Sequence, residues 1–205
     1  MGVPRIHQLL DVARAGEVLA HDVALRLVTR VADPADAGFL MRQAGQERGH
    51  ARVFAAAGAM LGRCPGRDGD KLMRPFRRAL EADLDTGRVD AAVVGLHLVL
   101  EALGSEVVGR INLDLHGLGR AFAPVRRALL AQEDAHHVFG IRYIARSLRT
   151  DPQRRPAIDA AATQYVALAR TLLEDCDALF SLSRATPADY LGLVRGRVAD
   201  ALVAA

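Results

Sequence analysis

The stretches Gln46-Glu47-Arg48-Gly49-His50 and Gln132-Glu133-Asp134-Ala135-His136 both read Q-E-x-x-H, and they lie 86 residues apart. In an α-helix, residues three apart lie on one face, so each stretch directs a carboxylate and an imidazole toward the same point. A single E-x-x-H occurs often by chance. Its repetition is more informative, because it predicts two similar helical halves that offer the same pair of ligand atoms.

A helical segment with one carboxylate in an apolar stripe precedes each repeat. Glu17 lies 30 residues before Glu47, and Glu101 lies 32 residues before Glu133. The same-face neighbours of Glu17 are all apolar, namely Leu10, Ala13, Ala20, Ala24 and Val28. A carboxylate buried in such a stripe is costly unless it is paired or bound to metal. For either glutamate alone, a buried salt bridge explains the pattern equally well.

Taken together, these residues match a two-metal site. Carboxylates and imidazoles from four helices form the ligand set of di-iron and di-manganese sites in helical bundles. The predicted ligands are Glu17, Glu47, His50, Glu101, Glu133 and His136. Such donors suit iron and manganese and leave coordination positions open for O₂. The predicted cofactor is therefore two iron ions, or a manganese–iron pair.

Composition favours one all-α domain over residues 1–205. Aromatic residues are scarce, with 3 Tyr, 6 Phe and no Trp, whereas Ala, Leu, Val and Arg dominate. No charge-free stretch reaches the roughly 18 residues of a membrane span, and the amino terminus lacks the apolar region of a signal peptide. We therefore expect a cytoplasmic protein without a membrane segment. Cys64 and Cys176 follow no C-x-x-C spacing and are expected to be reduced structural thiols.

The charge pattern bears on possible partners. The net charge is +3, with one lysine, Lys71, against 26 arginines. Short arginine clusters occur at 74–78, 126–127 and 154–155, but they are interleaved with acidic residues. We interpret them as solvated helix faces, with contact to RNA as the less favoured alternative.

Apolar periodicity and helix-breaking residues predict six substantial helices and one short one. Asp33-Pro34 and Asp151-Pro152 separate neighbouring helices, and the glycines after residue 61 end another. The expected ranges are 6–31, 34–61, a short helix at 71–85, then 88–115, 122–149, 156–183 and a last helix from 187.

Over residues 5–149 the six predicted ligands resemble those of the ferritin-like di-iron carboxylate superfamily. The resemblance implies a four-helix bundle with a long crossover between helices two and three, followed here by extra C-terminal helices. It also implies that Glu47 and Glu133 bridge the metals. Glu17 with His50, and Glu101 with His136, would each complete one ion.

Within the superfamily, the spacing is most similar to O₂-activating members such as aldehyde-deformylating oxygenases and a tRNA hydroxylase. Bacterioferritin carries a haem-binding methionine where this chain has Arg48. Rubrerythrin carries an extra carboxylate where this chain has Leu98 and Gly104.

Several further residues are candidates for supporting roles. Metal-bound imidazoles normally donate their second N–H to an acceptor. We expect Gln132 to accept from His50, and Gln46 from His136. His97 and His137 are also near the ligands, as supporting groups or as additional ligands. Candidate walls of a substrate pocket are Phe54, Val94 and Leu98, although ordinary core packing is the favoured reading for these three residues.

The preferred function is an oxygenase or hydroxylase that takes O₂, an organic substrate and electrons from a donor, as a monomer or homodimer. The alternative is a ferroxidase or iron-storage protein, and a metal-free helical interaction module is a third reading. An apolar pocket beside the metals would distinguish the first from the second, because an oxygenase needs one and a ferroxidase does not.

Overall fold

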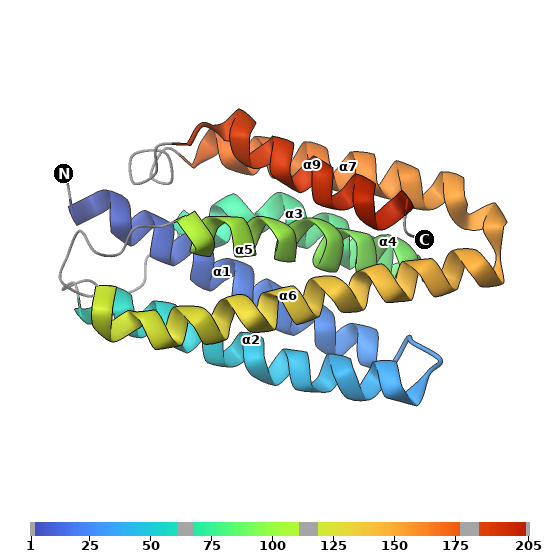
Figure 1. Cartoon of the computed structure of the whole chain (residues 1–205), viewed down its shortest axis with the longest axis horizontal. Coiled ribbons are helices and arrows are strands. Elements are labelled where there is room, and N and C mark those ends of the chain that lie inside the picture. Colours follow the sequence, from blue (N-terminus) through green and yellow to red (C-terminus); the bar gives the residue numbers. More distant parts are fainter. Residues whose placement is uncertain (1–2, 61–67, 111–118, 177–184, 204–205) are drawn as a thin grey trace.

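Long helices lie side by side in the computed structural model, which describes residues 3–60, 68–110, 119–176 and 185–203 (Figure 1). Within these ranges every regular element is helical, as the composition predicted. Two antiparallel pairs form the bundle: α1 (Val3–Val28) with α2 (Pro34–Met60), and a composite helix with α6 (Gly119–Thr150). The composite helix consists of α4 (Val89–Val93), η1 (Val94–Leu100) and α5 (Glu101–Arg110).

The crossover between the two halves is a helix of its own. In Figure 1, α2 and the α4–α5 helix run in the same direction, so the chain must return along the bundle between them. Helix α3 (Asp68–Asp85) makes this return while packed against α1. Gly87, with φ of 74°, then turns the chain into α4, in a backbone region that favours glycine.

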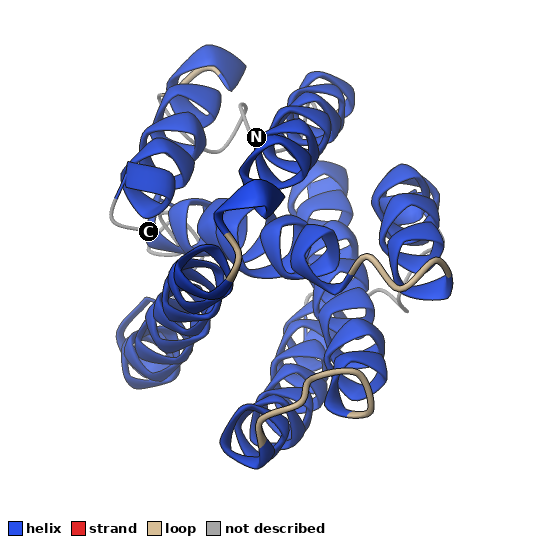
Figure 2. Cartoon of the chain, turned by 90° about the vertical axis from the view of Figure 1, so that its right-hand side faces the viewer, coloured by secondary structure: helices blue, strands red, loops and turns tan. Residues whose placement is uncertain are grey.

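The C-terminal helices cover one side of the bundle. After the short 3₁₀ turn η3 (Pro152–Arg154), α7 (Arg155–Asp175) and α9 (Pro187–Val203) pack against each other and against the η1–α5 helix (Figures 1 and 2). The architecture is that of a ferritin-like bundle with two added helices.

Apolar side chains at helical spacing form the core. On α1, Leu19, Val23 and Leu27 recur every four residues and are almost completely buried. Burying one such side chain contributes about 1.5–3 kcal/mol to folding. The same cluster continues through α3, η1 and α7 to α9, so the described helices share one core. A single domain over the whole chain stays a prediction.

Helix boundaries differ modestly from those expected. Helix α1 ends at Val28 rather than Val31, where the amide of Val31 donates to the Leu27 carbonyl at 3.1 Å in a closing turn. The Asp33 carboxylate accepts from the Ala35 amide at 2.8 Å and caps α2, as the Asp-Pro signal indicated. The expectations for Cys64 and for 111–115 and 177–183 lie outside the described residues.

The helix predicted over residues 88–115 needs a correction. It is not uniformly α-helical, because η1 is a π-helical segment directly before Glu101. The helix Val89–Gly109 is also long and apolar enough to cross a membrane by length and composition, but 78% of its most apolar window is buried inside the molecule. A helix at the centre of a bundle core has the same composition.

Candidate metal centre

The six predicted ligands converge from four helices at the centre of the bundle. Glu17 comes from α1, Glu47 and His50 from α2, Glu101 begins α5, and Glu133 and His136 come from α6. All except Glu17 are at least 96% buried, and the Glu17 side chain is 13% exposed. Burying so many ionisable side chains close together is costly unless they are paired or bound to metal.

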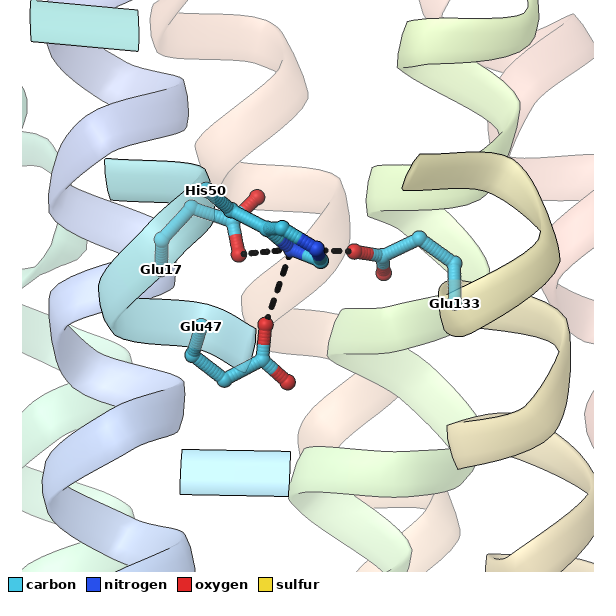
Figure 3. A group of neighbouring side chains, drawn as sticks. All are labelled: Glu17, Glu47, His50 and Glu133. Carbon is cyan, nitrogen blue, oxygen red and sulfur yellow. Dashed lines mark hydrogen bonds and ion pairs between the residues drawn. The ribbon is translucent and has the colours of Figure 1, made fainter. Parts of the chain in front are cut away.

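One group of potential ligands surrounds the imidazole of His50. Its Nδ1 lies 3.1 Å from Glu47 Oε2, 3.2 Å from Glu17 Oε2 and 3.3 Å from Glu133 Oε1 (Figure 3). Each of these four residues offers one ligand atom, and the four atoms lie within 4.8 Å of one another.

A second group surrounds His136. Its Nδ1 lies 3.0 Å from Glu47 Oε1 and 3.4 Å from Glu101 Oε2. Glu47 thus belongs to both groups, and its two oxygens face different imidazoles whose ring centres are 6.4 Å apart. This geometry suits a carboxylate that bridges two ions. Glu133 belongs only to the first group and hydrogen-bonds Glu101, so its bridging role stays a prediction.

The glutamines before each glutamate contact the opposite imidazoles. Gln132 Oε1 accepts from His50 Nε2 at 2.6 Å, and Gln46 Oε1 accepts from His136 Nε2 at 2.8 Å. This pairing was predicted from the sequence and is confirmed. Because Nε2 donates to the amide oxygen in each case, Nδ1 is the ring nitrogen left to face the carboxylates, which is the orientation that a metal ligand needs.

The electrostatics of the site show a deficit of positive charge. Burial raises the pKa of Glu17 and of Glu101 well above the usual range, and neighbouring carboxylates add to this effect. Burial would lower the pKa of His50, but the contacts with Glu133, Glu17 and Glu47 outweigh it and raise that pKa to about 12. Protons held by Glu17, Glu101 and His50 therefore offset the negative charge of the buried carboxylates.

The donor set fits a pair of metal ions. Among the ion pairs of the described residues, only imidazoles supply a cation to these four carboxylates. Glu47 Oε2 is buried without a hydrogen bond. Two divalent cations would neutralise the carboxylates and satisfy this oxygen, with the mixed oxygen and nitrogen donors that iron and manganese prefer.

An apolar cavity of about 90 Å³ adjoins the ligands. Its only charged lining residues are Glu17, Glu101 and Glu133, and the remainder is almost entirely apolar. Gly104 lines this cavity, and a side chain at that position would occupy space beside Glu133, because its Cβ would lie 3.5 Å from Glu133 Oε2.

The three candidate walls named from the sequence do not line this cavity and lie in the core, which was the favoured reading for them. Phe54 packs instead in a separate cluster with Leu10, Val108 and Leu129. Val94 and Leu98 belong to the main core, on the part of the helix before the cavity. The remaining lining comes from α1, the end of η1 and α5, while α3, the end of α7 and Cys176 close the cavity. These residues are Leu9, Val12, Ala13, Gly16, Ala20, Met73, Leu100, Leu103, Gly104, Val107, Val108, Leu172, Leu173 and Cys176.

His97 and His137 lie outside both ligand groups. His97 Nε2 donates to Gln43 Oε1 at 2.9 Å, and His137 Nδ1 donates to the His97 backbone carbonyl at 2.8 Å. Burial lowers the pKa of His97 to about 3, so this ring is neutral. Gln43 was not among the residues predicted from the sequence, although it lies four residues before Glu47 on the same helical face.

Comparison with known proteins supports the fold. No protein-family model matches the chain, and no curated protein sequence does. Among solved structures, the chain is similar to "Protein 19 with aldehyde deformylating oxidase activity from Synechococcus". The TM-score is 0.85 and the identity 20%, over 98% of this chain and 89% of that one. At this identity the likeness establishes a shared fold.

Proposed function

We propose that this chain binds two transition-metal ions, either two irons or a manganese–iron pair, and activates O₂ to oxidise an apolar organic substrate. The observation that carries this proposal is the apolar cavity, which borders three of the six proposed ligands. An oxygenase needs such a space for its substrate, whereas a ferroxidase, the alternative, needs only a path for iron.

The roles of the residues follow from their atoms. Two bound iron ions would offer open coordination positions for O₂ and would pass to it electrons that a donor replaces. Glu47 reaches both positions, and His50 and His136 offer Nδ1 while Gln132 and Gln46 hold their Nε2–H groups. Glu17, Glu101 and Glu133 form the boundary between ligands and cavity, so a substrate in the cavity would lie against the metal pair.

The cavity favours an elongated substrate with one reacting end. On α1 its lining runs from Ala20 beside the ligands back to Leu9, a helical rise of about 16 Å. At the far end α5 contributes Val108, while α7 contributes Leu173. A linear apolar molecule would extend along α1, with its reacting end at the carboxylates. The aldehyde deformylating oxidase activity of the structural neighbour agrees with this substrate class.

Turnover would also require an electron donor, and we place the reaction in the cytoplasm. O₂ consumption by the iron-loaded protein with a chemical reductant tests the proposal, using straight-chain aldehydes of increasing length as probes. We expect consumption to depend on the aldehyde, with an oxidised product. Consumption that depends on Fe²⁺ alone, with accumulation of ferric ion, would instead establish the ferroxidase.

A cavity-filling variant links the activity to this space. A Cβ on Gly16 would meet only Met73 Cε, at 4.0 Å, so Gly16→Leu can be accommodated by extending into the cavity. We expect it to abolish aldehyde-dependent O₂ consumption while the metal content stays that of the wild type. Unchanged consumption would remove the cavity from the substrate path.

A further inference from the structure

A chain of buried hydrogen bonds joins the two halves of the bundle, from His97 on η1 to Gln43 on α2, and reaches two of the proposed ligands. His97 Nε2 donates to Gln43 Oε1 at 2.9 Å. Gln43 Nε2 in turn donates to Glu47 Oε1 at 3.0 Å and to Glu101 Oε1 at 2.9 Å. Gln43 and His97 are both fully buried. Because both amide hydrogens and the amide oxygen of Gln43 are engaged, its orientation is fixed.

The backbone around His97 is shaped for this contact. In the π-helical segment η1, the amide of Glu101 donates to the carbonyl of Leu96, five residues earlier. An α-helix would direct this amide to the carbonyl of His97, which here accepts from His137 Nδ1 at 2.8 Å. Gly140 permits the approach of α6, since a Cβ there would lie 2.4 Å from His97 Cβ. Short π-helical segments are rare and concentrate at functional sites.

The positions that the repeat makes equivalent to Gln43 and His97 lack this chain. The repeat offset of 86 residues makes Leu129 the counterpart of Gln43, four residues before Glu133. Leu129 packs in an apolar cluster. The counterpart of His97, four residues before Glu17, is Ala13, which lines the cavity. The two halves match at the ligands and differ directly behind them.

We propose that Gln43, held by His97, positions Glu47 and Glu101 and so makes the two metal positions unequal. The position formed by Glu47, Glu101 and His136 then binds its ion first and more tightly. This inference rests on the metal pair proposed above.

The physical reason is preorganisation of the ligand oxygens. Gln43 engages Oε1 of Glu101, which leaves Oε2, the oxygen that faces His136, for a metal ion. Groups behind metal ligands that orient them in this way typically change metal affinity by about 10- to 100-fold when removed. Among the described contacts, Glu17 receives a side-chain hydrogen bond from His50 alone.

Co²⁺ titration tests the proposal, because visible absorption reports Co²⁺ coordination without any turnover. His50→Ala retains the Glu101/His136 position, and His136→Ala retains the other. We expect His97→Leu to weaken Co²⁺ binding about 10- to 100-fold in the His50→Ala protein and less than about threefold in the His136→Ala protein. His97→Gln keeps an N–H donor to Gln43 and should restore the affinity. In the otherwise unaltered protein, two resolved binding steps should merge when Gln43→Leu is introduced.

Matched variants keep the test decisive. Leu129→Met changes the counterpart of Gln43 without altering polarity, and should leave both affinities unchanged. If His97→Leu does not fold, the double variant Gln43→Leu/His97→Leu replaces both partners by apolar groups, which is usually tolerated. Equal weakening at both positions, or failure of His97→Gln to restore the affinity, would overturn the positioning role. A protein that binds no Co²⁺ at all would refute the metal pair itself.

Discussion

At the scale of single residues, Glu47 is the most informative side chain, because each of its oxygens faces a different imidazole at about the same distance. Its spacing to His50 could be read from the sequence, since residues three apart share a helical face. Helical spacing also places Gln43 beside Glu47, but it does not give the other two contacts of Gln43. Its contacts to Glu101 and His97 join residues more than 50 positions apart, and no local pattern specifies such pairs.

Removing Glu47 should therefore affect both metal positions. We expect Glu47→Ala to reduce the metal content of the purified protein from two ions per chain to none, because each position loses an anionic ligand. Glu17→Ala is the matched comparison and should lose one ion, since Glu17 belongs to one group only. Elemental analysis of both proteins decides the matter, and full occupancy in Glu47→Ala would exclude the bridging role.

Metal affinity should also rise with pH. The raised pKa of His50, about 12, means that its ring is protonated at neutral pH before metal binds. A metal at Nδ1 must displace this proton, so increasing pH favours the bound state. Between pH 6 and 8 we expect the affinity for Mn²⁺ to increase at least about tenfold per pH unit, as release of one proton requires. Titration calorimetry in buffers of different ionisation enthalpy measures the released protons, and an affinity independent of pH would contradict this account.

At the scale of elements, the helices follow from the sequence, and their irregularity does not. Apolar periodicity and the Asp-Pro signals located α2 and the start of α7 to within one residue, whereas α7 ends at Asp175, earlier than predicted. The π-helical segment η1 was missed because it depends on tertiary contacts. Tyr165 packs against Gly95, His137 donates to the His97 carbonyl, and Gly140 admits the His97 side chain.

Glycine substitutions test how closely η1 and α6 must approach. Gly140→Ala would place a Cβ 2.4 Å from His97 Cβ, so we expect a loss of about 1–3 kcal/mol in the free energy of unfolding. Gly49→Ala is the control, because a Cβ there meets nothing within 4 Å and alanine stabilises helices by up to about 1 kcal/mol. Urea denaturation measures both variants. Equal stabilities would show that the helices can separate at little cost.

At the scale of the whole molecule, the added helix α7 and the crossover α3 close the side of the bundle that holds the cavity, and α9 packs against α7 and α5. The four ligand-bearing helices alone would leave that side open. The sequence predicted these elements but not the cavity, because a cavity depends on where side chains from several helices fail to meet. Its position beside the ligands is the feature that favours an oxygenase over an iron store.

Assembly state separates these two functions. An iron store must enclose its mineral in a closed shell of many subunits, whereas an oxygenase needs only one or two. We expect light scattering to show a monomer or a homodimer of the 22.0 kDa chain. A particle of a dozen or more subunits would instead favour iron storage.

The central claim is that two metal ions lie between the four helices and share Glu47, and anomalous X-ray diffraction from iron-soaked crystals tests it most directly. We expect two anomalous peaks per chain, one beside Nδ1 of His50 and one beside Nδ1 of His136, with Glu47 between them. A single peak, or two peaks away from these imidazoles, would contradict it.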